Sequence, residues 1–434
     1  MDALGSFGPN PILAVAVSGG ADSMALTLLL NRWTQKHQGK LYALTVDHGL
    51  RKESFFEAET VQGWMRDLNI SHEILEWQGE KPQTHIQDRA RRARYTLLEN
   101  YCKEREIPHL FLAHHLEDQA ETFWLRFLKK SGIDGLAAMP FIQETPFLRK
   151  IRPCLHISKA RLQSTLETFG HSYLKDPSNS NMDFQRVKIR AQQDMFKSIG
   201  LTPHLIKDLV KKNTWVKEAL EQATFKALFE GAELSPLGYL ILQMEPLKQD
   251  AFEISRRVLE KALMCIGGGD YPPRWESLIP ILECLRSKNA EFLKKTLNHT
   301  LLKKKGGVLY IIPETKRSTP LDLDVQDLFS KKETSFVWDG RFLIKRSEES
   351  FKKNRQENGK GFVLKSLGGQ GRAILKKQKV DCAPHPWEVL ESLPSLWEGE
   401  YLLSVPHLKW GMESWSSAGF EEELFFYPKV SLSP

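Results

Sequence analysis

A six-residue string near the N-terminus, Ser18-Gly-Gly-Ala-Asp-Ser23, combines small residues, hydroxyls and one carboxylate. It follows a short apolar run rich in valine and precedes an apolar stretch with helical period, so it joins a strand to a helix. The first turn of a helix presents unpaired N–H groups and partial positive charge, which suits an anion such as phosphate. We therefore expect a phosphate-binding loop made of Ser18, Gly19, Gly20, Ala21, Asp22 and Ser23.

The residue types of this loop indicate how it works. Gly19 and Gly20 allow close approach of a ligand and positive φ, and the hydroxyls of Ser18 and Ser23 can donate to phosphate oxygens. A carboxylate beside phosphate is repelled unless a cation intervenes, so Asp22 predicts Mg²⁺. The loop lacks the Gly-Lys-Ser/Thr of a Walker A motif. The alternative is a strand–helix turn that only needs small residues.

A second group of acidic residues follows a predicted strand, in the string Ala113-His-His-Leu-Glu-Asp-Gln-Ala-Glu121. With a helix starting near Glu117, Asp118 and Glu121 share one face and can bind Mg²⁺ or an ammonium group. The adjacent His114 and His115 are expected on opposite sides of a strand, which argues against a metal cage. The alternative is an acidic first turn that only complements the helix dipole.

Further polar residues lie at another strand end and on two predicted helices. Asp47, His48 and Arg51 end the second strand, beside the expected loop. The helical arginines share faces by their spacing and suit phosphate groups or an RNA backbone. These are Arg91 and Arg94 on one helix, and Arg186 and Arg190, with Lys188 between them, after an Asp-Pro-Ser-Asn turn at 176–179.

The alternation of strand and helix patterns predicts an α/β fold, a parallel sheet covered by helices on both faces, through residue 190. Ligands in such sheets bind at the C-terminal ends of strands, where these motifs fall. The expected strands are residues 12–17, 41–46, 72–77 and 110–114, and the expected helices are 24–36, 56–68, 86–105 and 118–129. A mainly helical middle follows, with helices at 207–229, 251–265 and 275–301, and then a small α+β C-terminal domain with a β-rich tail from Phe362.

Composition and charge narrow the function class. The 434 residues, 41% of them hydrophobic, suit three domains, which we place at 1–210, 211–345 and 346–434. Residues 303–379 hold 19 Lys and Arg against 9 Asp and Glu, a net of +10, which favours either an RNA surface or a solvated linker. Five scattered cysteines without a Cys-x-x-Cys pair, no bilayer-length apolar run and no basic signal region predict a cytoplasmic protein without a membrane partner.

The loop resembles the pyrophosphate loop (PP-loop) of the N-type ATP pyrophosphatases. It is followed in order by Val46-Asp-His-Gly-Leu-Arg51, Ala90-Arg-x-x-Arg-Tyr95, the acidic string from Ala113, Arg152-Pro153 and Asp176-Pro-Ser-Asn179, and with these motifs the chain resembles the tRNA(Ile)-lysidine synthase family over residues 12–190. The resemblance implies ATP as substrate, bound by Ser18 to Ser23 together with Asp47, His48 and Arg51. Residues 364–405, with Arg372 and Lys376, look like that family's C-terminal tRNA-binding module.

The resemblance implies a two-step ligation at the wobble cytidine of tRNA(Ile) with a CAU anticodon. The C2 carbonyl oxygen attacks the α-phosphate of ATP, and the ε-amine of free lysine then replaces AMP, giving lysidine. Catalytic roles are expected for Asp22, Asp118, Glu121, His114, Arg94 and Arg190, Mg²⁺ binding for Asp22 and Asp118, and tRNA binding for Arg91, Arg186, Lys188, Arg372 and Lys376. Either His114 or His115 would accept the proton of the amine.

The sequence leaves two other functions open. A tRNA thiolase on the same scaffold would need paired cysteines, and Cys102 and Cys154 offer no such pair in sequence. A non-catalytic tRNA-binding protein would bind RNA in a salt-sensitive way without consuming ATP. The sequence does not decide between a monomer and a homodimer.

Overall fold

The structure is a computed structural model that describes residues 4–5, 7–50, 53–79, 86–145, 147–174, 185–269, 271–287, 293–314, 322–325, 327, 334–345, 361–383, 385–421, 424–428 and 431–432. It divides into two compact units, residues 1–218 and 219–434. The helix α9 (Pro203–Gly231) begins in the first unit and ends in the second. None of the described helices is long and apolar enough to cross a membrane.

The first unit is built on a six-stranded sheet in the order β3-β2-β1-β4-β6-β5. All neighbouring strands are parallel except β5, which is antiparallel to β6. The strands are β1 (Ile12–Ala16), β2 (Lys40–Asp47), β3 (Ser71–Glu76), β4 (His109–Phe111), β5 (Ile142–Glu144) and β6 (Arg149–Ile151). The predicted parallel sheet is confirmed.

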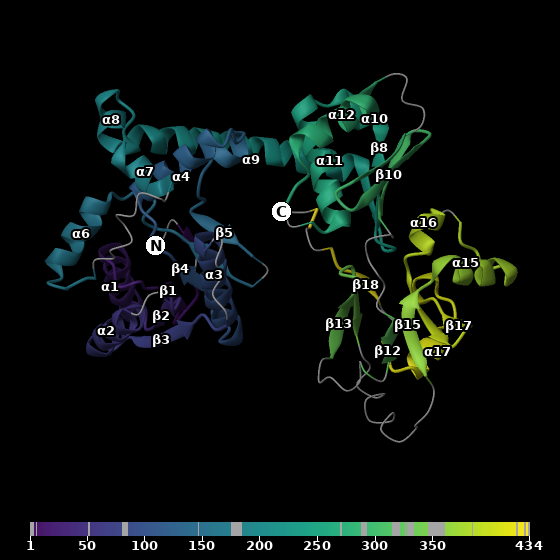
Figure 1. Ribbon diagram of the computed structural model, residues 1–434, viewed down its shortest axis with the longest axis horizontal. Coiled ribbons are helices and arrows are strands. Elements are labelled where there is room, and N and C mark those ends of the chain that lie inside the picture. The colour runs from purple at the N-terminus through teal and green to yellow at the C-terminus, as the bar shows by residue number, and fades with distance from the viewer. Residues whose placement is uncertain are drawn as a thin grey trace. The chain divides into compact units, whose positions relative to one another are not determined.

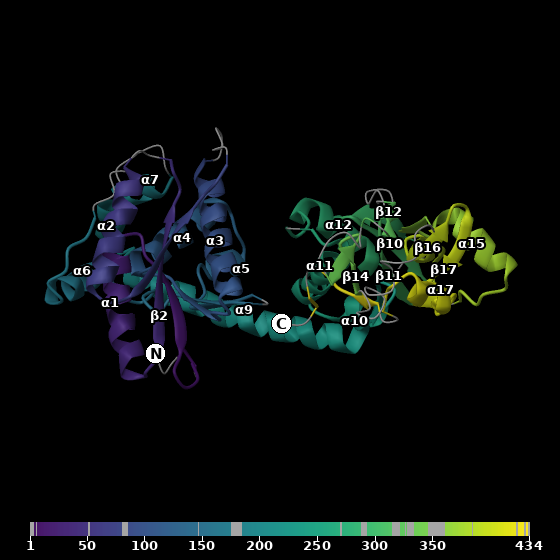
Figure 2. The same cartoon turned by 90° about the horizontal axis from the view of Figure 1, so that it is seen from below.

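Helices cover both faces of this sheet because successive strand residues point to opposite sides. Leu13 and Val15 pack in a core with α1, α2 and α6, whereas Ala14, between them, packs on the other side with Leu98 of α3. Figures 1 and 2 show α1, α2 and α6 on one side of the strands and α3 on the other. The helices of this unit are α1 (Ala21–Lys36), α2 (Ser54–Asp67), α3 (Ile86–Glu104), α4 (Leu116–Leu128), α5 (Ile133–Leu136), α6 (Lys159–Thr168), α7 (Gln185–Ala191) and α8 (Gln193–Ser198).

The second unit contains more sheet than the sequence predicts. A five-stranded antiparallel sheet in the order β7-β8-β11-β10-β9 packs against α10 (Met244–Gln249), α11 (Phe252–Gly267) and α12 (Trp275–Arg286). Its strands are β7 (Ala232–Ser235), β8 (Tyr239–Gln243), β9 (Leu293–Leu297), β10 (Thr300–Lys305) and β11 (Val308–Pro313). The middle of the chain is therefore α+β: the helices predicted at 207–229 and 251–265 are present, and the error of the prediction is that it leaves out the sheet.

The error has a local cause at residues 275–301, predicted as one helix. The helix α12 ends at Arg286, and β9 and β10 then form a hairpin in which Leu297 pairs with Thr300. The two residues of the turn, Asn298 and His299, have φ of 51° and 61°. Positive φ at both positions is typical of the tight turns that join antiparallel strands, and asparagine favours it.

Two smaller sheets complete the second unit. One has the order β12-β15-β16-β17 and the other β13-β14-β18. The strand β15 begins at Phe362, which confirms the predicted start of the β-rich tail. The remaining elements are β12 (Leu323–Asp324), β13 (Ser335–Trp338), β14 (Phe342–Lys345), β15 (Phe362–Ser366), α15 (Gly368–Lys377), α16 (Trp387–Leu390), β16 (Pro394–Glu398), β17 (Tyr401–Ser404), a 3₁₀ turn (Pro406–Leu408), α17 (Met412–Ser417) and β18 (Phe425–Phe426).

Candidate active site

The glycine-rich string forms the expected turn between β1 and α1. The backbone N–H of Ser18 donates to Oγ of Ser23 at 3.2 Å, and the two hydroxyl oxygens lie 3.3 Å apart. The Ser23 hydroxyl also contacts the carbonyl of Gly20, the N-cap of α1, at 2.9 Å. These contacts fold the loop around the first turn of α1, whose N–H groups suit an anion.

The two glycines of the loop serve different purposes. Gly19 has φ of +78°, and a Cβ there would lie 2.7 Å from Leu174 and 2.8 Å from Val61. Gly20 has φ of −70°, which any residue adopts, so the positive φ that glycine allows is used at Gly19 and not at Gly20. A Cβ on Gly20 would meet only the Ser18 hydroxyl, at 3.7 Å. Backbone conformation and packing therefore require glycine only at Gly19.

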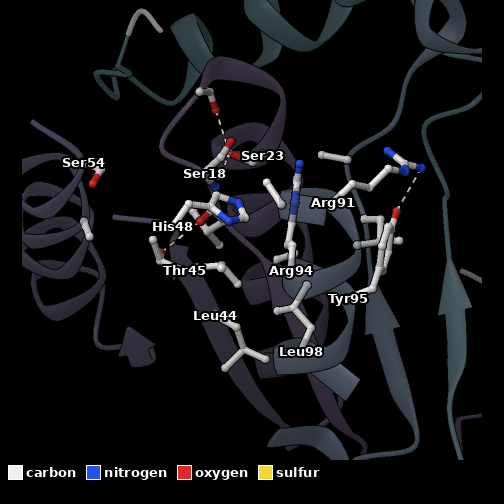
Figure 3. A pocket seen from close by; sticks show the side chains of 18 of the residues that line it. Ser18, Ser23, Leu44, Thr45, His48, Ser54, Arg91, Arg94, Tyr95 and Leu98 are labelled. Atoms are coloured by element: carbon white, nitrogen blue, oxygen red, sulfur yellow. Dashed lines mark hydrogen bonds between the residues drawn. The ribbon is translucent and has the colours of Figure 1, made fainter. Parts of the chain in front are cut away.

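A cavity of about 590 Å³ opens beside this loop, within the size range of small-molecule sites. Figure 3 shows Ser18 and Ser23 on one side of it, His48 and Arg94 in the middle, and Arg91 beside Tyr95. The predicted residues that line the cavity are Ser18, Gly20, Asp22, Ser23, His48, Arg91, Arg94, His114, Asp118 and Arg186. The fold thus brings these predicted residues together from five separate segments.

Three arginines line the cavity and contribute positive charge, namely Arg91, Arg94 and Arg186. Arg94 lines the cavity, where desolvation lowers the pKa of its guanidinium, with a smaller contribution from the neighbouring Arg91 and Arg186. The Arg91 guanidinium lies over the Tyr95 ring, 5.2 Å from its centre, and its Nη2 is 3.5 Å from the Tyr95 hydroxyl. Guanidiniums gathered at one cavity favour a polyanion such as a triphosphate or an RNA backbone.

His114 also lines the cavity. Burial lowers its pKa to about 3, against the opposing effect of Asp118, so the ring is neutral near pH 7. The strand β4 ends at Phe111, so His114 and His115 follow the strand and the prediction that it reaches residue 114 is wrong. His114 faces the cavity, whereas His115 is buried beside Asp22.

The carboxylates of Asp22 and Asp118 meet at a shared histidine. Nε2 of His115 lies 3.6 Å from Oδ2 of Asp22 and 3.4 Å from Oδ2 of Asp118, and its Nδ1 lies 3.0 Å from Oε2 of Glu117. Burial alone would lower the pKa of His115, but the three carboxylates outweigh it and raise the pKa. Burial raises the pKa of Asp22, and the electrostatic effects of His115 and Lys159 partly oppose this rise.

Glu121 pairs with Arg190 instead of facing the cavity. Its side chain is 2% exposed, and both carboxylate oxygens accept from Arg190, Oε1 from Nε and Oε2 from Nη2 at 3.1 Å. Nη2 of Arg190 also lies 3.7 Å from Oδ1 of Asp118. The predicted shared face of Asp118 and Glu121 is confirmed, since one guanidinium contacts both carboxylates.

Several predicted residues lie outside the cavity. Asp47 accepts the backbone N–H of Gly49 at 2.8 Å, and Lys188 is exposed on α7. Ala21 packs in the core, and Gly19 packs behind the loop. Arg51 and the turn at 176–179 are outside the described residues.

The remaining predicted residues, Arg372 and Lys376, lie in the second unit. Both are exposed on α15. The Arg372 guanidinium lies 5.2 Å from the centre of the Trp387 ring, and its Nε is 3.4 Å from Oε1 of Glu391.

Sequence reasoning missed the apolar and hydroxyl parts of the cavity wall. Leu44, Leu98 and Thr45 line it from β2 and α3, and Nε2 of His72 lies 2.8 Å from the Thr45 hydroxyl. The hydroxyl also donates to the Val17 carbonyl at 2.9 Å. In the sequence these residues look like ordinary core positions. Only the cavity in the structure identifies them as part of its wall.

Known proteins are similar to the first unit by itself and to nearly the whole chain. Residues 4–194 match the PP-loop domain family, so the first unit is a PP-loop domain. Over nearly the whole chain, tRNA(Ile)-lysidine synthases are similar. That of Ruegeria pomeroyi is 31% identical over 92% of this chain and 89% of its own length, and that of Wolbachia pipientis is 30% identical over 92% and 90%. The chain belongs to the tRNA(Ile)-lysidine synthase family.

A solved structure of another tRNA-modifying enzyme is more distant. The U34-tRNA thiolase of Methanococcus maripaludis shares 18% identity at a TM-score of 0.43, over 49% of this chain and 74% of that one. A likeness at this level carries no conclusion about the present chain.

Proposed function

We propose that this protein ligates free lysine to C2 of the wobble cytidine, position 34, of tRNA(Ile) with a CAU anticodon. The C2 carbonyl oxygen attacks the α-phosphorus of ATP and pyrophosphate leaves. The lysine ε-amine then attacks C2, and AMP leaves with the former carbonyl oxygen. The product, lysidine, changes decoding from AUG to AUA. The observation that carries the proposal is the phosphate loop opening onto an arginine-lined cavity, in a chain that belongs to this family.

The loop and the arginines act on different parts of ATP. The N–H groups of the first turn of α1 and the hydroxyls of Ser18 and Ser23 hold the pyrophosphate group as it leaves. Arg94 and Arg91 neutralise the charge that grows on the phosphorus and its oxygens. Because both guanidiniums already line the cavity, little reorganisation accompanies the reaction.

Two carboxylates at the loop suit Mg²⁺, which binds proteins through one or two carboxylates and completes its shell with phosphate and water. Oδ1 of Asp22 is buried without a hydrogen-bond partner among the described residues, and Asp118 lies beside Asp22 across His115. No cluster of three or more metal-binding side chains is found in the described part of the chain, so phosphates must supply further ligands. Bound Mg²⁺ would stabilise negative charge on the leaving pyrophosphate.

Asp118 is better placed than Glu121 to orient the incoming lysine. Asp118 lines the cavity, whereas Glu121 is held by Arg190 and acts by fixing that arginine. The ammonium must lose a proton before attack, and neutral His114 accepts it. Its pKa of about 3 makes it a weak base, and nearby phosphate charge raises that pKa toward a useful range.

The tRNA requires contacts away from the reacting base. Arg186 at the cavity, Lys188 on α7, and Arg372 and Lys376 on α15 would contact phosphates of the tRNA backbone through their positive charge. The wobble cytidine must leave the anticodon stack to enter the cavity, which costs little in a single-stranded loop.

Sulfur transfer, the other chemistry considered for this scaffold, finds no support in the cysteines near the sheet. Burial raises the pKa of the Cys102 and Cys154 thiols to about 12 and about 11. A buried thiol that does not ionise is a poor nucleophile.

The test is incorporation of radiolabelled lysine into a transcript of tRNA(Ile) with a CAU anticodon, in the presence of ATP and Mg²⁺. We expect label only when ATP is present, and none in a transcript whose wobble cytidine is replaced by uridine. A folded protein that binds the transcript and incorporates no lysine contradicts the proposal.

A further inference from the structure

The imidazole of His115 is buried in contact with three carboxylates, although it does not line the cavity. The residue is 5% exposed, its Nε2 faces Asp22 and Asp118 at 3.6 and 3.4 Å, and its Nδ1 faces Glu117 at 3.0 Å. A ring with a carboxylate facing each of its nitrogens is fixed in orientation. It therefore lies between Asp22 and Asp118 and contacts both carboxylates.

Glu117 is itself anchored. Its Oε2 accepts the backbone N–H of Lys159, the first residue of α6, at 2.9 Å. Oδ2 of Asp118 accepts the backbone N–H of His115 at 3.1 Å. The contacts join the N-terminal turns of α1, α4 and α6, which are far apart in sequence. They hold the ring against the carboxylates more firmly than a single contact would.

The position of this ring matters because Asp22 and Asp118 carry like charges on different helices. The ring contacts both carboxylates and so holds together two side chains that would otherwise repel each other. In metal sites, replacing the partners that orient the ligands typically costs about 10- to 100-fold in metal affinity or activity. Glu117 and His115 are such orienting partners for the carboxylates of Asp22 and Asp118.

We propose that Glu117 and His115 form a positioning pair that holds the carboxylates of Asp22 and Asp118 in place for Mg²⁺ and the phosphates of ATP. Neither residue lines the cavity, so neither is a catalytic residue. The assignment rests on the part of the proposed function that places ATP and Mg²⁺ at the loop. It does not depend on which nucleoside or amine reacts.

The test measures binding of α,β-methylene-ATP, which cannot lose pyrophosphate, to the full-length protein by calorimetry. Affinity is measured with Mg²⁺ and again with EDTA, and the ratio of the two dissociation constants is the readout. In Glu117→Gln we expect this Mg²⁺-dependent gain to fall by about 10- to 100-fold. The affinity in EDTA and the melting temperature should stay near those of the wild type.

Glu144→Gln is the matched control, because Glu144 is 72% exposed, pairs with Arg149 at 3.3 Å and does not line the cavity. It should behave as the wild type. His115→Gln is a second variant with a larger expected loss. Should it fail to fold, Glu117→Gln still decides the matter, since its side chain is partly exposed and keeps its size.

The proposal is overturned if Glu117→Gln keeps the full Mg²⁺-dependent gain, if it loses affinity equally with and without Mg²⁺, or if the wild type shows no gain. Lysine incorporation by the wild type is scored separately. A protein that makes no lysidine but loses the Mg²⁺-dependent gain in Glu117→Gln would refute the proposed function and leave the positioning pair standing.

Discussion

Replacing Gly19 by alanine should damage the phosphate loop by two separable effects. A non-glycine residue at φ of +78° is strained by about 1–2 kcal/mol. The added Cβ would also come within 2.7 Å of Leu174 and 2.8 Å of Val61, and such overpacking typically costs about 1–3 kcal/mol. Together these predict a loss of about 2–5 kcal/mol in the free energy of unfolding of the first unit.

Two other glycines of the same unit separate the effects. Gly170 has φ of +66° and open space around its Cβ position, so Gly170→Ala should show only the strain, about 1–2 kcal/mol. Gly20 has φ of −70° and only an ordinary contact, so Gly20→Ala should lose little stability.

The assay is urea denaturation of the full-length variants, followed by circular dichroism and by protease resistance of residues 1–218. The account predicts the order Gly19→Ala, then Gly170→Ala, then Gly20→Ala in decreasing loss of stability. A Gly19→Ala protein no less stable than Gly170→Ala would refute the packing of the loop against α2 and Leu174.

Three further predictions concern other parts of the protein. Arg190→Met should lower the free energy of unfolding by about 3 kcal/mol because it leaves the buried Glu121 carboxylate unpaired, and adding Glu121→Gln should restore most of it in urea denaturation. Burial lowers the pKa of His407 to about 4, so the unfolded chain binds the extra proton between pH 6.5 and 4 and stability falls as pH falls through that window, by up to about 3 kcal/mol. His407→Leu should flatten this pH dependence, and an unchanged profile would contradict the burial argument. Lys376→Ala should weaken tRNA binding and reduce the slope of log affinity against log salt by about 1, whereas an unchanged slope would place Lys376 away from the RNA.

Sequence reasoning succeeded where chemistry and local pattern coincide. The Ser-Gly-Gly-x-Asp-Ser string could be placed between a strand and a helix because the apolar period changes across it, and β1 and α1 flank it in the structure. The pairing of Asp118 with Glu121 followed from helical spacing alone, and both contact Arg190.

Prediction from the sequence failed where the decisive contacts join residues distant in sequence. It also failed where the spacing of apolar residues fits both a helix and a strand. Leucines at 293, 297 and 301 match a helical period, but the Asn298-His299 turn made a hairpin of that segment. The contact of His115 with Asp22 depends on the pairing of β1 with β4, which brings the helices after these strands side by side. No spacing in the chain indicates that contact.

The central claim is that the cavity beside the loop activates a cytidine carbonyl with ATP before lysine enters. The most direct measurement uses ATP radiolabelled at the α-phosphate with tRNA(Ile) bearing a CAU anticodon and no lysine. The account predicts that label accumulates on the tRNA, depends on the wobble cytidine, and is released as AMP when lysine is added. Label that never joins the tRNA, or that stays on it after lysine is added, would contradict the account.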